Sequence, residues 1–130
     1  MQRDLLGFKK VNDVVAETLE TTPHKIVNNL GEILKERGLS QGDLSRMTGL
    51  RVATINDFTN LKSSSVNFTH LVPIMIALRI SDMREIIRVE FPEEVTKQFE
   101  EDMEGYVGGL TPKMEQEVAK NVKNMYIQKF

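Results

Sequence analysis

The 130-residue chain has no cysteine and no tryptophan, and it has only two histidines and four prolines. The absence of cysteine excludes a disulfide framework and a thiolate metal site. The two histidines, His24 and His70, lie far apart in the sequence and outside any metal-ligand spacing. The chain also lacks a histidine–carboxylate cluster and a glycine loop of the kind that cradles a phosphate. The sequence therefore predicts no metal, no cofactor and no catalytic activity.

Long apolar runs are missing as well. No segment approaches the ~20 apolar residues that a membrane-spanning helix needs. The N-terminus carries Arg3, Asp4, Lys9 and Lys10 where a signal peptide would have its apolar stretch. We therefore expect a cytoplasmic protein that makes no use of a membrane. With 40% hydrophobic and 28% charged residues, the chain suits one globular domain with helical appendages.

The formal net charge of −2 does not favour binding to a polyanion, but the charge is unevenly distributed. Residues 24–80 hold seven Lys and Arg against four Asp and Glu, whereas residues 92–130 hold five against eight. A mildly basic segment followed by an acidic one is typical of a nucleic-acid-binding module joined to a separate interaction region.

The chain shows no sustained period-two alternation and no hairpin turn, so we predict an all-α fold. Helices are predicted over residues 3–20, over residues 23–38 with Pro23 in the first turn and Gly38 after the end, and over a short segment after Ser81. Further helices are expected at 40–48, 52–60, 67–79 and 93–103 and from 112 onward. Pro73 lies inside one of them and predicts a kink or a late start.

The segment 40–60 has the layout of two short helices joined by a sharp turn. Ser40 is a good N-cap, and Asp43 completes a capping-box-like pair with it. Gly49 lies where the chain must turn, because glycine adopts a positive φ without steric cost. Three residues at helical spacing then supply an apolar face for the second helix: Leu50, Ile55 and Phe58. This is the arrangement of a helix-turn-helix, whose second helix enters the major groove of DNA.

These residues resemble the lambda-repressor/Cro-like family, also called the Xre family. The matching positions are Ser40-Gln41, Leu44-Ser45, Gly49-Leu50 and Ile55, followed by Ser65-Val66-Asn67-Phe68, Leu71, Ile74, Ala77-Leu78 and Ser81. The resemblance covers about residues 26–88. It implies a lambda-repressor-like helix-turn-helix core with additional N- and C-terminal helices. We expect three parts: an N-terminal helix (1–22), a DNA-binding domain (23–91) and a C-terminal helical extension (92–130).

The resemblance also implies which residues touch double-stranded DNA. The predicted contact set consists of Gln41, Arg51, Val52, Ala53, Thr54, Asn56, Asp57, Lys62 and Ser63. Gln41 and Thr54 are expected at phosphates, with Gln41 also bracing the second helix, and Lys62 and Ser63 at the backbone on the other side.

The base-reading positions depart from those of many relatives. Val52 and Ala53 can contact thymine methyl groups but cannot identify guanine. Arg51 suits a guanine or a phosphate, and both roles stay open. The Asp57 carboxylate would repel phosphate unless it accepts a hydrogen bond from the amino group of cytosine or orients Arg51.

The leading interpretation is a transcriptional regulator, a repressor of phage or mobile-element type that binds a near-palindromic operator as a homodimer. The apolar stripe Met114, Val118, Val122 and Met125 predicts that residues 93–130, with or without helix 3–20, form the dimer interface or hold a protein partner. The alternative is that the stripe packs against the core of its own chain. The alternative function is a protein-interaction module, antitoxin-like or other, that uses the helix-turn-helix as a scaffold.

Overall fold

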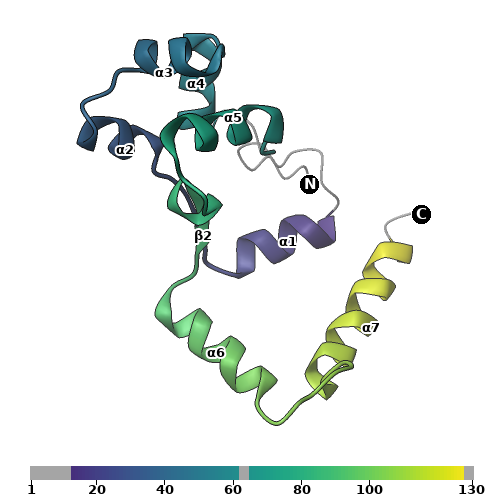
Figure 1. The fold of residues 1–130 in the computed structure, drawn as a ribbon. Coiled ribbons are helices and arrows are strands. Elements are labelled where there is room, and N and C mark those ends of the chain that lie inside the picture. Colours follow the sequence, from purple (N-terminus) through teal and green to yellow (C-terminus); the bar gives the residue numbers. More distant parts are fainter. Residues whose placement is uncertain (1–12, 62–64, 128–130) are drawn as a thin grey trace. The chain divides into compact units, whose positions relative to one another are not determined.

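The structure is a computed structural model that describes residues 13–61 and 65–127, with the side chains of 125–127 left out. Its described residues divide into two compact units (Figure 1). Residues 25–90 form one, which we call the helix-turn-helix unit. Residues 13–24 and 91–127 form the other, which we call the terminal unit.

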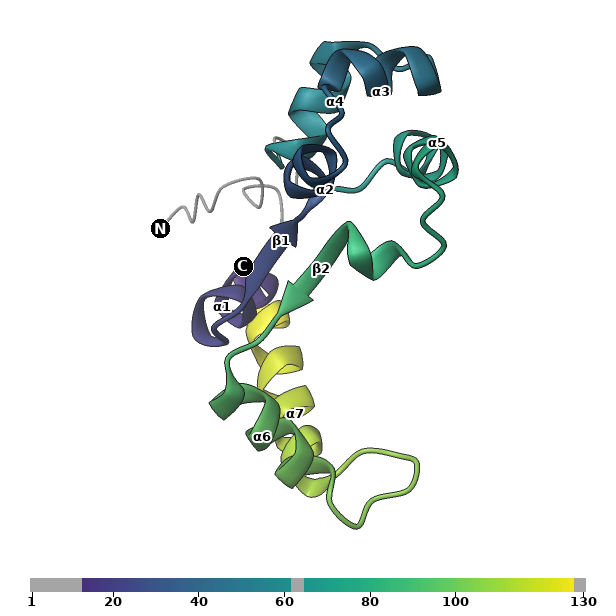
Figure 2. The same cartoon turned by 60° about the vertical axis from the view of Figure 1, so that its left-hand side comes forward.

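The helix-turn-helix unit consists of four α-helices, a 3₁₀ turn and two short strands. In chain order these are β1 (Lys25–Asn28), α2 (Leu30–Glu36), α3 (Gln41–Thr48), α4 (Val52–Thr59), α5 (Phe68–Leu78), η1 (Met83–Glu85) and β2 (Ile87–Glu90). The strands pair antiparallel, with Lys25 opposite Glu90 and Asn28 opposite Ile87 (Figure 2). The strand pair therefore joins the first and last segments of this unit.

The core of this unit is apolar and receives side chains from every helix. Its buried members are Leu30, Leu34, Leu44, Ile55, Leu71, Ile74, Leu78, Ile80, Ile86 and Ile87. Leu50 and Phe58, which flank Ile55 in the sequence, are partly buried against it. The apolar face predicted for residues 50–58 is therefore the face that packs inward. Because core side chains interlock at high density, the core fixes how α4 lies against α3 and α5.

The predicted helix over residues 23–38 is wrong in its first half, because residues 25–28 form β1 and the helix begins only at Leu30. The backbone N–H of Asn29 donates to the Ile86 carbonyl at 2.7 Å, and Asn28 Oδ1 accepts from the Leu30 N–H at 3.0 Å. Both contacts favour an extended chain that turns into a helix at this point. The strand's partner lies far along the chain, and a four-residue strand leaves too short a pattern to detect.

The helix expected after Ser81 is also wrong. Only the 3₁₀ turn η1 forms there, and the chain then enters β2. Ile86 and Ile87 are buried as predicted, but Met83 is exposed. The described residues nevertheless hold seven α-helices and a single two-stranded sheet, so the all-α class is confirmed.

Other helix ends lie where the sequence predicts them. Gly38 follows α2 with a φ of +68°, and the Asn67 side chain accepts from the Thr69 N–H at 2.9 Å at the start of α5. Pro73 lies within α5, which begins at Phe68, so the proline does not delay the start of the helix.

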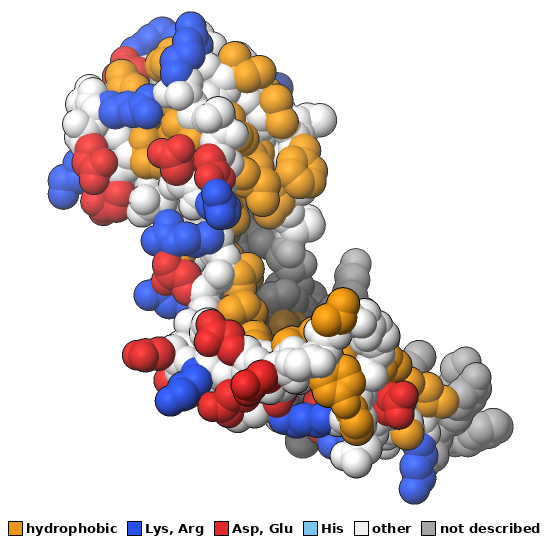
Figure 3. Space-filling view, turned by 60° about the horizontal axis from the view of Figure 1, so that its bottom comes forward, with side chains coloured by type: hydrophobic (Ala, Val, Ile, Leu, Met, Phe, Trp, Pro, Cys, Tyr) orange, Lys and Arg blue, Asp and Glu red, His pale blue; other side chains and the backbone are white. Residues whose placement is uncertain are grey.

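The terminal unit contains α1 (Asp13–Thr21), α6 (Glu93–Met103) and α7 (Pro112–Ile127). The helices predicted at 93–103 and from 112 are confirmed, and so is the described part of the predicted helix 3–20; residues 3–12 lie outside the described residues. Among the side chains described in this unit, only Ala16 and Thr111 are buried. Exposed apolar and acidic side chains lie next to one another on its surface (Figure 3).

Ion pairs and one aromatic contact connect the parts of the terminal unit. Lys120 Nζ lies 3.4 Å from Glu17 Oε1, and Lys113 Nζ lies 3.2 Å from Asp102 Oδ1. The rings of Phe91 and Phe99 meet edge to face, with centroids 5.4 Å apart. No helix in the described ranges is long and apolar enough to cross a membrane.

Candidate nucleic-acid interface

Helix α3 begins at a complete capping box, as the sequence predicts. Ser40 Oγ accepts from the Asp43 N–H at 3.0 Å, and Asp43 Oδ2 accepts from the Ser40 N–H at 2.8 Å. The backbone hydrogen bond from Ser40 is the main reason that the pKa of Asp43 lies below its ordinary value. The reciprocal bonds satisfy two N–H groups that the helix itself leaves unpaired. The position of Gln41, the first residue of α3, is thereby fixed.

The turn between α3 and α4 is held by three side-chain hydrogen bonds. Gly49 has a φ of +83°, which confirms the sharp turn predicted at this glycine. Ser45 Oγ donates to the Leu50 carbonyl at 2.5 Å. Thr48 Oγ1 accepts from the Leu50 N–H at 3.1 Å and donates to the Leu44 carbonyl at 2.8 Å. The sequence analysis did not predict that the Ser45 and Thr48 hydroxyls hold this turn.

The far end of α4 is held by Asn28, a residue that the sequence interpretation missed. Asn28 Nδ2 donates to the Phe58 carbonyl at 2.9 Å, while its Oδ1 accepts from the Leu30 N–H. One carboxamide thus connects β1, the start of α2 and the last turn of α4. Asn28 and Asn29 precede the apolar residues of α2, and asparagine at such a place is a signal for a helix start. This signal could have identified Asn28 from the sequence.

Helix α4 presents most of the predicted contact residues to solvent. Arg51, Val52, Ala53, Asn56 and Asp57 are exposed, whereas Thr54 is half-buried. Arg51 is the N-cap residue, and its side chain makes no capping hydrogen bond. The N–H groups of the first turn of α4 are therefore available to an anion such as a DNA phosphate.

The structure brings Gln41 and Asn56 together across the two helices. Gln41 Nε2 lies 3.5 Å from Asn56 Oδ1, and Asn60 Nδ2 donates to the same oxygen at 3.2 Å. Gln41 was expected to brace the second helix. Asn60 was not among the predicted residues, although its spacing of four from Asn56 is the spacing of neighbours on a helix face.

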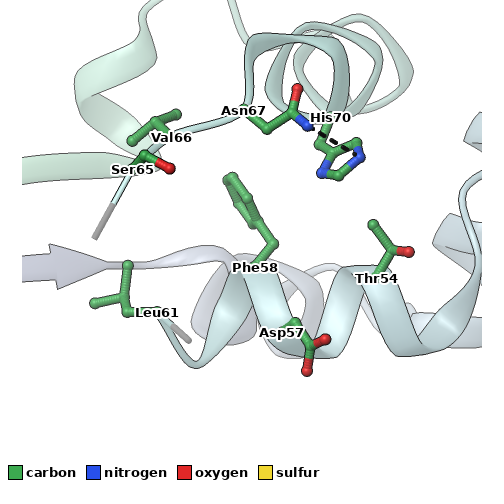
Figure 4. A pocket seen from close by; sticks show the side chains of 8 residues that line it. All are labelled: Thr54, Asp57, Phe58, Leu61, Ser65, Val66, Asn67 and His70. Carbon is green, nitrogen blue, oxygen red and sulfur yellow. Dashed lines mark hydrogen bonds between the residues drawn. The ribbon is translucent and has the colours of Figure 1, made fainter. Parts of the chain in front are cut away.

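Thr54 and Asp57 border a half-open cavity of about 310 Å³ between α4 and the start of α5 (Figure 4). The cavity is lined by Thr54, Asp57, Phe58, Leu61, Ser65, Val66, Asn67 and His70. Phe58 points into it, whereas the carboxylate of Asp57 points away. Lys62 and Ser63, which were predicted to contact the DNA backbone, lie outside the described residues.

Arg51 and Asp57, which carry opposite charges, do not form a contact in the described part of the structure. Arg51 and Asp57 have no ion pair and no side-chain hydrogen bond with any part of the chain that the structure describes, so Asp57 does not orient Arg51 there. Arg46 differs, because its guanidinium pairs with Asp43 at 2.5 Å. Within the described residues, Arg51 is thus exposed and its guanidinium has no intramolecular partner, which leaves it available to a ligand such as DNA.

Comparison with protein families gives one match. Residues 29–92 match the family model described as a Cro/C1-type HTH DNA-binding domain. The matched span runs from just before α2 to just after β2. No curated protein and no solved structure matches the chain.

Proposed function

Through residues 29–92 this chain belongs to the Cro/C1-type helix-turn-helix DNA-binding family, and we propose that it regulates transcription by binding an operator with α4 in the major groove. The observation that carries the proposal is the placement of α4. Its inner face is locked by Ile55, its two ends by Ser45 and Asn28, and its outer face is free. A helix held in this way can present its first residues to base edges without ordering itself on binding.

Each residue of this face is assigned a DNA contact that suits the chemistry of its side chain. Arg51 contacts a guanine edge or a phosphate, since its guanidinium suits both. Val52 and Ala53 pack against thymine methyl groups. Gln41 and Thr54 donate to phosphates on one side, and Lys62 and Ser63 do so on the other. With only two apolar contacts and one arginine, a large share of selectivity comes from the shape of the DNA.

The proposed regulator is a repressor of phage or mobile-element type that occludes a promoter. It acts as a homodimer on a near-palindromic operator, because one module buries too little DNA surface for tight binding. We assign residues 23–91 to DNA binding, the apolar faces of α6 and α7 within residues 92–130 to the dimer interface and residues 1–22 to a supporting helix. Exposed apolar side chains on α6 and α7 support this assignment: Phe99 and Met103, and Val118 and Val122.

A binding titration tests the DNA-binding proposal. The protein is titrated at ~150 mM salt against DNA from upstream of its own gene and against a random duplex of equal length. A preference of ~10³ or more for the native fragment is the expected result. Equal and weak binding to both duplexes would overturn the proposal of an autoregulating repressor.

A pair of valine variants tests the dimer. Val118→Glu places a charge on the exposed stripe of α7, whereas Val107→Glu changes a residue that is 99% exposed in the same unit. Analytical ultracentrifugation should show a dimer for the wild type and for Val107→Glu, and a monomer for Val118→Glu. A dimer that survives Val118→Glu and also the removal of residues 93–130 would exclude the proposed interface.

One set of observations favours a second function, a protein-interaction module of antitoxin type or another kind. Val52 and Ala53 lack hydrogen-bonding groups, Asp57 is exposed on the same face, and the net charge is negative. Salt separates the two functions. DNA affinity falls steeply with salt concentration because bound counterions are released, whereas a scaffold with no DNA affinity shows no such dependence.

A further inference from the structure

The carboxamide of Asn56 is held in one orientation by two neighbours. Its Oδ1 accepts from Gln41 Nε2 at 3.5 Å and from Asn60 Nδ2 at 3.2 Å. A carboxamide oxygen has two lone pairs, so both acceptor sites are occupied. The Asn56 side chain, which is exposed, is left with its two N–H donors and no free acceptor.

Each neighbour is in place for a structural reason. Asn60 follows α4 with φ and ψ of −89° and 6°, so it continues the helix face on which Asn56 lies. Gln41 is fixed at the first position of α3 by the capping box in front of it. The residue at the start of α4 is Val52, which offers the Gln41 carboxamide no hydrogen-bonding group. The Gln41 side chain instead reaches Asn56, one turn further along α4.

We propose that Gln41 and Asn60 are positioning residues that make Asn56 a donor only, and that Asn56 thereby selects guanine over adenine at one position of each half-site. The inference rests on the proposed function, and it specifies which base class this face reads. In the major groove guanine offers two acceptors, N7 and O6, to the two N–H donors of Asn56, whereas thymine offers one, O4, and adenine offers one, N7, beside its N6 donor. Adenine is normally read by an asparagine that donates to N7 and accepts from N6, which requires the free oxygen that Asn56 lacks. Asn56 also rejects cytosine, because cytosine presents only the N4 donor and Asn56 has no free acceptor for it.

The same contacts connect base choice to the DNA backbone. A carboxamide nitrogen carries two hydrogens, so Gln41 and Asn60 each keep one N–H after bonding to Asn56. Gln41, at the N-terminus of α3, can give this second N–H to a phosphate oxygen. The side chain that orients Asn56 is then itself aligned by the DNA.

The test is selection from a random duplex library with the full chain. The proteins compared are the wild type, Asn56→Ala, Asn60→Ala and a matched control, Gln116→Ala, which removes an exposed carboxamide from α7. The wild type and the control should enrich guanine at one position of each half-site. Asn56→Ala should lose that preference. Asn60→Ala should admit adenine, lowering the discrimination against it by roughly fivefold, the value of one neutral hydrogen bond. Asn60→Gln keeps a carboxamide donor and should retain the preference.

Two results would overturn the inference while leaving the proposed function intact. They are an unchanged consensus in Asn56→Ala, and continued rejection of adenine in Asn60→Ala. If the wild type enriches no sequence, the proposed function itself fails, and the inference fails with it. The three cases are distinguishable from one set of enriched pools.

A measurement without DNA checks the network and covers the case of a variant that folds poorly. In the free protein, the side-chain carboxamide resonances of Gln41 and Asn60 should both shift in Asn56→Ala and stay unchanged in Gln116→Ala. Circular dichroism shows whether each variant is folded, and Asn56→Ser replaces Asn56→Ala if the alanine variant is not. Unchanged Gln41 and Asn60 resonances in a folded Asn56 variant would contradict the proposed orientation.

Discussion

The helix-turn-helix unit and the terminal unit differ most in what they bury. The first has ten buried apolar side chains, and they form one cluster that reaches every helix of the unit. In the described part of the second, Ala16 is the single buried apolar side chain, and Phe99, Met103, Val118 and Val122 are each close to half exposed. Since apolar burial is the main favourable term in folding, the first unit has the means to be stable by itself. The second has apolar surface to offer to a partner.

The difference also concerns rigidity. In the helix-turn-helix unit, the Asn28 and Ser45 side chains donate hydrogen bonds and the Ser40 hydroxyl accepts one, and these bonds fix helix ends and the turn before α4. In the terminal unit, the contacts between α1, α6 and α7 include surface ion pairs, which contribute little stability. A DNA-reading surface needs fixed geometry, whereas a surface that closes on a second copy gains its packing on association.

The largest effect that separates the two units is expected from truncating a leucine in each. Leu44→Ala removes a side chain with 0% exposure, and Leu110→Ala removes one with 53% exposure. The first should lower the free energy of unfolding by roughly 2–5 kcal/mol, because it leaves a cavity in the core. The second should change it by no more than about 0.5 kcal/mol. Urea unfolding followed by circular dichroism measures both. Similar losses in the two variants would contradict the contrast in burial.

The next effect concerns which unit touches DNA. Arg51→Ala and Lys97→Ala each remove one exposed positive charge, the first from the start of α4 and the second from α6. We expect Arg51→Ala to weaken operator binding by about 1–3 kcal/mol if Arg51 reads guanine, and to relax specificity at one position. If Arg51 lies on a phosphate, the slope of log affinity against log salt should fall by about 0.9. Lys97→Ala should leave both quantities unchanged in fluorescence-anisotropy titrations. An effect of Lys97→Ala equal to that of Arg51→Ala would show that only total charge matters.

Much of the fold of the helix-turn-helix unit was predictable because its signals are local. Ser40, Gly49 and Asn67 act within a few residues of themselves, and each one lies at the helix end or turn that it predicts. The strands were missed because β1 depends on pairing with β2, which lies some sixty residues later. Ile26 and Val27 look equally suited to a helix until that partner is known.

The candidate site was predictable in outline but not in its network. Helix position alone places Arg51, Asn56 and Asp57 on the outer face of α4. The bond from Asn28 to the Phe58 carbonyl spans thirty residues, and no local pattern encodes it. The orientation of Asn56 likewise depends on where α3 places Gln41, which the tertiary packing decides.

A smaller effect is expected from removing one helix cap in each unit. Ser40 caps α3, and Thr111 Oγ1 accepts from the Met114 N–H at 3.1 Å at the start of α7. Loss of such a cap costs about 1 kcal/mol, which corresponds to about fivefold faster hydrogen exchange in the affected helix. Ser40→Ala should therefore speed exchange in α3 and leave α7 unchanged, and Thr111→Ala should do the reverse. Changes in both helices from either variant would show that the two units do not open independently.

The smallest expected effect is a difference in acid response between two aspartates. Hydrogen bonds from the Arg84 side chain and backbone lower the pKa of Asp82 from 3.8 to about 2. In the terminal unit, the hydrogen bond from Gln98 is the first cause of the lowered pKa of Asp102, and Lys113 adds to it. A carboxyl group whose pKa is lower in the folded state stabilises the fold above its unfolded pKa. That contribution is lost as the pH falls through the folded pKa.

The sequence separation of the partners decides which aspartate matters more for stability. Arg84 lies two residues from Asp82 and can reach it in an unfolded chain as well, whereas Lys113 meets Asp102 only when α6 and α7 come together. We therefore expect Asp102→Asn to flatten the fall of the melting temperature between about pH 4 and pH 2 more than Asp82→Asn does. Carboxyl chemical shifts should still show Asp82 titrating near 2 in the folded wild type. If Asp82→Asn flattened that fall more, the Arg84 contact would depend on the fold, and the weakly packed terminal unit would gain no stability from its ion pair.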